Sequence, residues 1–212
     1  MADRISVYID GESHFIRTER AWSTLHGNGA TLGCLRYKDQ TDDRLVLFVP
    51  RANVFWTRKF SAGASRSVYF TAAVADAQGL HQIKVDLRNF DLEPNVILEK
   101  KQAAERRWNK RRDAGVIEKP KGVDIALAVR MLEDAHRHAF DRCHLYTSDA
   151  DFLPVINAVM AQGKQVYVFG HKDSLADQSE LLHVPDQFID LGEVLRSECE
   201  FVPPKASNPA AG

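Results

Sequence analysis

One stretch of this chain joins a strand-like segment directly to a helical one, and that junction restricts the fold more than any other feature. Residues 143–147 form a mainly apolar run that is typical of a buried strand. Residues 152–162 then carry apolar side chains at helical spacing, and Pro154 lies in the first turn, where its missing N–H leaves no hydrogen bond unmade. A strand that leads straight into a helix is the repeating unit of α/β proteins. We therefore expect a sheet covered by helices.

The same alternation continues along the chain. Further strands are predicted at residues 5–9, 67–74, 96–99, 165–169 and 187–191. Further helices are predicted at residues 13–25, 77–90, 102–112, from 123 onward, at 174–183 and after 191. Strands that alternate with helices favour a doubly wound α/β fold, with a mainly parallel sheet and helices on both faces.

The helix that opens at residues 121–124 has a distinct apolar stripe. The stripe is formed by Ile125, Ala128, Val129 and Leu132. Such a stripe is the face that an amphipathic helix normally turns toward the core. Asp124 is predicted to project beside it from the first helical turn.

Length and composition favour one folded domain over residues 1–202. The chain has 212 residues, of which 44% are hydrophobic, and this is enough for a substantial core. Residues 27–66 mix glycine breaks with short apolar runs, and we predict an irregular insertion there. Residues 203–212 are polar and proline-rich, which predicts a disordered tail.

Several classes of protein are disfavoured by what the sequence lacks. The first residues lead at once into a strand-like segment, without the apolar core of a secretion signal, and no apolar run approaches the length of a membrane span. The expectation is a soluble cytoplasmic protein. The three cysteines are far apart and form no C-x-x-C pair, which argues against a disulfide framework or a zinc site.

Four aspartates stand where ligands bind in an open α/β sheet. Asp10 ends the first predicted strand, Asp149 and Asp151 occupy the strand-to-helix junction, and Asp124 begins a helix. The carboxyl ends of parallel strands share one edge of the sheet. Four carboxylates gathered there would repel one another unless a cation neutralised them, and oxygen ligands are those that Mg²⁺ prefers. The alternative is that Asp149 and Asp151 are helix caps, although one cap needs only one aspartate.

A basic block precedes Asp124. Residues 100–121 contain nine Lys and Arg residues and three acidic ones, a local charge of +6 in a chain whose net charge is −1. Arg107 and Arg111 lie one helical turn apart on one predicted face. The block is a candidate contact for nucleic-acid phosphates, and the alternative is a solvated helix face.

Four motifs stand in order along the chain: Val-Tyr-Ile-Asp-Gly-Glu-Ser, Lys-Gly-Val-Asp-Ile-Ala-Leu-Ala-Val, Ser-Asp-Ala-Asp-Phe-Leu-Pro-Val-Ile and Gly-Lys-Gln-Val-Tyr-Val-Phe-Gly. Together they resemble the NYN domain (LabA-like) of the PIN-like nuclease superfamily. The resemblance runs from about residue 4 to residue 195, apart from residues 17–66. It implies a PIN-like, Rossmann-type three-layer fold.

The resemblance also implies a metal-dependent ribonuclease that hydrolyses RNA phosphodiester bonds, with single-stranded or structured RNA as the partner. The implied catalytic and metal-binding residues are Asp10, Asp124, Asp149 and Asp151, with Mg²⁺ or Mn²⁺ as the cofactor. Asp10 and Asp149 would hold the main ion. Asp124 would orient water or complete the ligand shell, and Asp151 would serve a second shell or a second ion.

Further residues are expected near the scissile phosphate. Ser13, Lys121 and Ser148 are the candidates. Two positions depart from the family pattern: Ser13 stands where members commonly carry asparagine, and Arg130 stands where a further aspartate often follows. A serine hydroxyl still forms hydrogen bonds, so that change is mild. Arg130 lies about 120° around the helix from Asp124, so its presence need not empty the metal site.

Two other functions remain open on the sequence. One is a non-catalytic NYN domain that binds RNA or a protein partner and keeps its acids as a metal-binding relic. The other is a Toprim-like phosphotransfer domain, which also places a glutamate, as Glu12 would be, after the first strand and an Asp-x-Asp pair at a later strand end. A Toprim domain would not explain why Asp124 stands in the sequence Lys-Gly-Val-Asp.

Overall fold

The structure is a computed structural model that describes residues 3–27, 30, 35–37, 63–71, 91–94 and 122–201. The helices predicted at 77–90 and 102–112, the strand predicted at 96–99, the tail and most of the 27–66 insertion lie outside these residues. The acidic candidates and the sheet around them lie inside.

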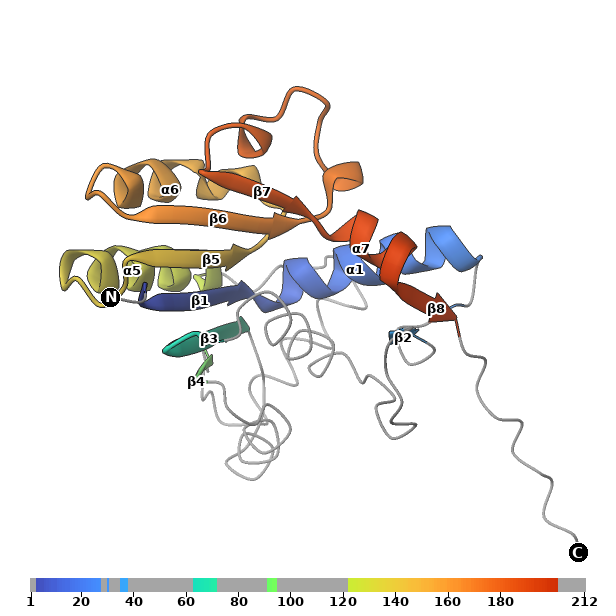
Figure 1. Cartoon of the computed structure of the whole chain (residues 1–212), viewed down its shortest axis with the longest axis horizontal. Helices are drawn as coiled ribbons and strands as arrows, with labels where there is room; N and C mark the ends of the chain where they lie inside the picture. The colour runs from blue at the N-terminus through green and yellow to red at the C-terminus, as the bar shows by residue number, and fades with distance from the viewer. Residues whose placement is uncertain are drawn as a thin grey trace, which may run out of the picture.

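Six strands form one parallel sheet, as the alternating sequence pattern predicts. In spatial order they are β4 (Asp91–Pro94), β3 (Arg66–Thr71), β1 (Ile5–Asp10), β5 (Arg142–Tyr146), β6 (Gln165–Gly170) and β7 (Gln187–Asp190). Every neighbouring pair is parallel. The arrowheads of β1, β5 and β6 therefore point to the same edge of the sheet (Figure 1).

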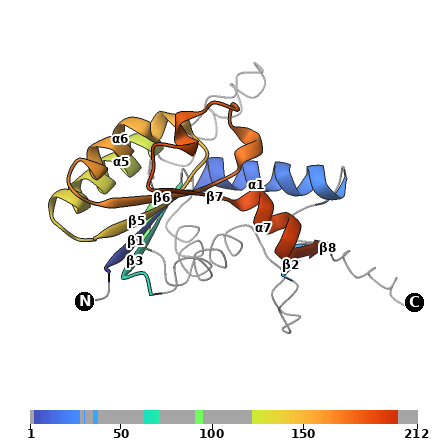
Figure 2. The same ribbon diagram turned by 45° about the horizontal axis from the view of Figure 1, so that its top comes forward.

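Helices cover both faces of this sheet. They are α1 (Gly11–His26), α5 (Val123–His136), α6 (Leu153–Met160) and α7 (Leu191–Glu198). α5 and α6 lie side by side over one face (Figure 2), whereas α1 extends past the end of β1 and lies beside α7 (Figure 1). The doubly wound three-layer prediction is confirmed.

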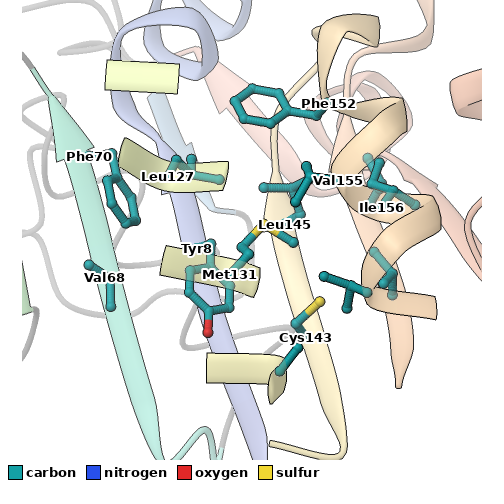
Figure 3. Packing of buried hydrophobic residues seen from close by; sticks show 14 of the residues in the cluster. Tyr8, Val68, Phe70, Leu127, Met131, Cys143, Leu145, Phe152, Val155 and Ile156 are labelled. Atoms are coloured by element: carbon teal, nitrogen blue, oxygen red, sulfur yellow. The ribbon is translucent and has the colours of Figure 1, made fainter. Parts of the chain in front are cut away.

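The alternating side chains of β1 explain the two cores. Tyr8 packs with the α5 and α6 side chains, and Leu145 of β5 and Met131 of α5 lie beside it (Figure 3). Val7 and Ile9 point to the other face, into a cluster that contains side chains of α1 and α7. β1 is thus buried on both sides, as expected for the centre of a parallel sheet.

The buried face of α5 differs from the predicted stripe. Ile125 and Val129 are 69% and 48% exposed, so the stripe that included them was wrong in phase. The buried apolar positions are instead Val123, Leu127, Met131 and Ala135. α5 is apolar on two sides, and its buried face also carries a charged residue, so the hydrophobic period alone could not select the correct side.

That charged residue is Asp134, which holds α5 against the sheet. Its Oδ2 accepts hydrogen bonds from the Tyr8 hydroxyl at 2.8 Å and from Arg130 Nε at 2.9 Å. Arg66 Nη1 of β3 lies 3.9 Å from the same oxygen. Arg130 therefore belongs to a structural ion pair within the helix.

The segment between β6 and β7 also departs from prediction. The helix expected at residues 174–183 is absent, and two short 3-10 turns, Lys172–Ser174 and Glu180–Leu182, stand there. Leu175 between them is extended, with φ −104° and ψ 157°. A polar run at residues 177–180 separates the apolar residues, so no continuous helical face packs on the sheet.

A two-stranded antiparallel sheet was not predicted. It pairs β2 (Leu35–Tyr37) with β8 (Cys199–Phe201) directly after α7. Across the described residues, no helix is long and apolar enough to cross a membrane.

Candidate active site

The acidic candidates lie at the point where the sheet reverses its strand order. β1 pairs with β3 on one side and with β5 on the other. The chain leaves β1 into α1, and it leaves β5 into a 3-10 turn (Ala150–Phe152) and then α6, which packs with the opposite core. Such a switch point leaves a crevice at the carboxyl edge of the sheet, which is the usual ligand site of open α/β folds.

Asp10 stands at this crevice as the last residue of β1. It is only 3% exposed, and it caps α1. Its Oδ1 accepts from the Ser13 backbone N–H at 3.4 Å, and its Oδ2 accepts from the Thr147 hydroxyl at 3.0 Å. These two bonds fix the orientation of the carboxylate and leave further lone pairs on both oxygens.

Thr147 connects the two strand ends and was missed by the sequence reasoning. Its hydroxyl donates to Asp10 and accepts from the Asp149 backbone N–H at 3.1 Å. It is fully buried, at the end of an apolar strand. In the sequence, the signal that could have identified it was a hydroxyl side chain at the end of an apolar strand, directly before Ser148 and Asp149.

The surroundings of Asp10 disfavour the ionised form of its carboxyl group. Burial raises the pKa of Asp10 from its usual 3.8 to about 6, against the opposing effect of the Thr147 hydrogen bond. Asp124 and Asp149 raise the pKa further through repulsion, and the Ser13 N–H lowers it. Asp124 and Asp149 are therefore close enough to Asp10 for their charges to act on it.

Asp149 is a helix cap, as the alternative interpretation held. Its Oδ1 accepts from the Asp151 N–H at 3.0 Å at the start of the 3-10 turn. Asp151 lies in that turn with its side chain exposed, and Asp124 lies exposed in the first turn of α5. A capping carboxylate still has a second oxygen, so capping and ion binding are compatible.

The donor set suits a hard divalent cation, because it consists of carboxylate and hydroxyl oxygens. In the part of the chain that the structure describes, no three acidic, histidine or cysteine side chains converge closely enough to hold an ion. Mg²⁺ commonly takes one or two protein carboxylates and completes its shell with water and substrate phosphate. Asp10 and Asp149, which Thr147 links through its hydroxyl, would supply the carboxylates of that mode.

Ser148 is held between the ends of β5 and β6. It is 2% exposed, and its Oγ accepts from the His171 backbone N–H at 2.7 Å. Gly170 is required beside it, because a Cβ at that position would collide with the Thr147 carbonyl and would stand 2.9 Å from Ser148 Oγ. This close packing fixes the path of the chain that leads to Asp149.

A buried polar group behind the crevice was also missed. His14 and His171 stack with ring centroids 6.2 Å apart, and Thr18 Oγ1 lies 2.8 Å from His171 Nε2. The Thr18 hydroxyl donates its single hydrogen to the His14 carbonyl, so His171 Nε2 is the donor in the second bond. Burial lowers the pKa of His14 to about 3 and that of His171 to about 4.

A cleft opens beside Asp149 with a volume of about 450 Å³. Arg17 of α1 lines it together with Ser148, Asp149 and residues from the segment between β6 and β7. Arg17 was not among the predicted site residues, although it follows Ser13 by one helical turn. Ser13 Oγ accepts a hydrogen bond from Arg17 Nε at 3.2 Å.

Comparison with protein families decides the affiliation of this fold. A family model described as the NYN domain matches residues 4–192. The chain belongs to the NYN domain family. The resemblance of its four motifs is thereby confirmed, and the site described above is the carboxyl-edge crevice of an NYN domain. This affiliation favours nuclease-type chemistry over the Toprim-like alternative.

One solved structure supports the fold of this NYN domain. It is the crystal structure of a protein of unknown function, VPA0982, from Vibrio parahaemolyticus RIMD 2210633. The two share 15% sequence identity with a TM-score of 0.55, over 89% of this chain and 93% of that one. The sequence search of curated proteins found no significant match.

Three candidates of the NYN domain lie outside the described residues. They are Lys121, Arg107 and Arg111. Their proximity to the crevice stays a prediction.

Proposed function

We propose that this NYN domain is a metal-dependent ribonuclease that hydrolyses RNA phosphodiester bonds at the crevice between β1 and β5. The supporting observation is the state of Asp10, a buried carboxylate whose pKa is raised by burial and by Asp124 and Asp149. A carboxylate in such surroundings is a common mark of a functional site. The affiliation with a family in the PIN-like nuclease superfamily adds to this.

In the proposed mechanism, Asp10 and Asp149 would hold a Mg²⁺ or Mn²⁺ ion, and Asp124 would orient water or complete the shell. When bound, such an ion lowers the pKa of a coordinated water and neutralises charge that builds on the phosphate. Thr147 fixes the orientation of Asp10 through its 3.0 Å hydrogen bond. Ser13 and Ser148 would lie near the scissile phosphate, and Asp151 stands exposed beside Asp149.

The proposal predicts metal-dependent cleavage. A labelled single-stranded RNA incubated with the protein should be cut with Mg²⁺ or Mn²⁺ and should stay intact in EDTA, with rates that differ by about a hundredfold or more, since the ion supplies the nucleophile. The same ions should raise the melting temperature, because they bind only the folded state. RNA that stays intact at millimolar Mg²⁺ or Mn²⁺ would contradict the proposed ribonuclease activity.

The alternative is a non-catalytic NYN domain that binds RNA or a protein. It is favoured by one observation: within the described ranges, no three side chains of metal-binding type converge on a point. RNA binding without cleavage, at millimolar Mn²⁺, would support this alternative.

RNA binding by the basic block forms a separate prediction. If Arg107 and Arg111 contact phosphates, affinity for single-stranded RNA should fall with salt at a log–log slope of about −0.7 for each contact. Replacing both should flatten the slope by about one to one and a half and should weaken binding to all sequences alike. The variant should keep its metal-dependent melting shift. An unchanged slope would assign both arginines to a solvated face.

A further inference from the structure

The cleft beside Asp149 combines one cation, a buried hydroxyl and apolar side chains. Arg17 and Ser148 lie on its wall, and Leu153 and Leu175 add apolar surface from α6 and from the segment between β6 and β7. Its volume of about 450 Å³ falls within the range of small-molecule sites. A nucleotide has matching parts, since it joins an anionic phosphate to a flat, largely apolar base.

Arg17 is fixed in the cleft by neutral acceptors. Its Nε donates to Ser13 Oγ and its Nη1 donates to the Ser174 carbonyl, each at 3.2 Å. Among the described residues, no carboxylate lies within ion-pair distance of Arg17, although Asp149 and Glu180 line the same cleft. The guanidinium therefore keeps its full charge and the N–H groups of Nη2 for another anion.

Ser148 offers a second donor to such an anion. Its Oγ accepts the His171 N–H, and across the described part of the chain no acceptor takes its hydroxyl hydrogen. A serine that is 2% exposed and that keeps a hydrogen-bond donor at a cleft wall is suited to a ligand oxygen. Arg17 and Ser148 reach the cleft from different elements, which gives an anion two directions of contact.

We propose that this cleft binds the nucleotide adjacent to the cleaved bond, with its phosphate on Arg17 and Ser148 and its base against Leu153 and Leu175. The assignment to a nucleotide of the substrate rests on the proposed ribonuclease function, because the cleft adjoins Asp149. Asp149 and Glu180 also line the cleft, and their negative charges repel a phosphate. The phosphate is therefore expected to bind at the Arg17 end of the subsite.

Binding of a nucleoside 5′-monophosphate tests the subsite without any cleavage. The probe contains no internucleotide bond, and the titration is done in EDTA. We expect a saturable shift of the Arg17 Nε–H resonance in NMR spectra, and an affinity that is about tenfold lower in Arg17→Gln, as for loss of a charge-assisted hydrogen bond. Inorganic phosphate should bind more weakly than the nucleotide, because it lacks the base.

Two further variants separate the subsite from a disturbance of α1. Arg20→Gln removes the same charge from an exposed position of the helix and should bind the nucleotide like the unmodified protein. Ala176→Trp places a bulky side chain on the cleft wall formed by the segment between β6 and β7, keeps the Arg17 side chain, and should weaken binding as Arg17→Gln does. In RNA cleavage assays, Arg17→Gln should lower kcat/KM about tenfold while Arg20→Gln leaves it unchanged.

Equal nucleotide affinity in Arg17→Gln and Arg20→Gln would overturn the phosphate contact. Equal affinity for phosphate and nucleotide would overturn the contact with the base. If the protein binds the nucleotide through Arg17 but cuts no RNA, the nucleotide-binding site is supported. The proposed nuclease function is then refuted.

Discussion

Replacing Asp10 with asparagine should abolish RNA cleavage and, at the same time, make the metal-free protein more stable at neutral pH. Cleavage is lost because the variant removes a proposed ion-binding carboxylate. Loss of a group that merely supports a metal ligand costs tenfold to a hundredfold, so loss of the ligand itself should exceed about a hundredfold. The stability gain arises because the carboxylate is ionised in a buried site that disfavours its charge.

The sign and size of the stability change follow from the pKa. In the folded protein the pKa of Asp10 is raised from 3.8 to about 6, so ionising it weakens the fold as pH rises through this interval. Two pKa units correspond to about 3 kcal/mol. The advantage of Asp10→Asn should therefore be absent near pH 4, grow up to pH 6 and stay constant above.

Urea denaturation in EDTA at several pH values measures this difference. Buried histidines such as His14 and His171 titrate in an overlapping range with the opposite sign, because their lowered pKa values weaken the fold as pH falls. Their effect cancels when the variant is compared with the unmodified protein. Asp177→Asn, at an exposed position, should change neither stability nor cleavage. If Asp10→Asn is less stable than the unmodified protein at pH 7, the destabilising effect assigned to the ionised Asp10 carboxylate is contradicted.

Asp134→Ala should destabilise the protein by about 3–5 kcal/mol, the usual effect of breaking a buried ion pair. The Asp134 side chain is 5% exposed, and it accepts from Tyr8 and Arg130. Burial, with Asp134 adding to it, raises the pKa of the Tyr8 hydroxyl, which therefore stays protonated and donates. The change would leave this hydroxyl and the Arg130 guanidinium without that acceptor.

The exposed pair on the same helix provides the control. Glu133 and Arg137 lie 3.8 Å apart with side chains 49% and 69% exposed, so Glu133→Ala should cost less than about 1 kcal/mol. Urea unfolding midpoints compare the two variants directly. Similar values for both would mean that Asp134 does not anchor α5, and Tyr8→Phe should then also have no effect.

The strand and helix order was readable from sequence because β1, β5 and β6 are short apolar runs next to helical patterns. Asp10 and Asp149 were predictable for the same reason, since each ends or follows such a run. Thr147 and Arg17 were not, because their roles depend on which strands are neighbours and on where residues 174–180 fold back. The phase of α5 was missed because Asp134, a charged residue, lies on the buried face.

The pairing of β1 with β5 also sets when the site can exist. Asp10 and Asp149 are far apart in the sequence, and they meet only after Arg142–Tyr146 has aligned beside Ile5–Asp10. An N-terminal fragment that ends before residue 142 contains Asp10 and Asp124 but lacks Asp149 and the β5 side of the crevice. During synthesis on the ribosome, the growing chain therefore has no assembled acidic site until its last third has emerged and folded.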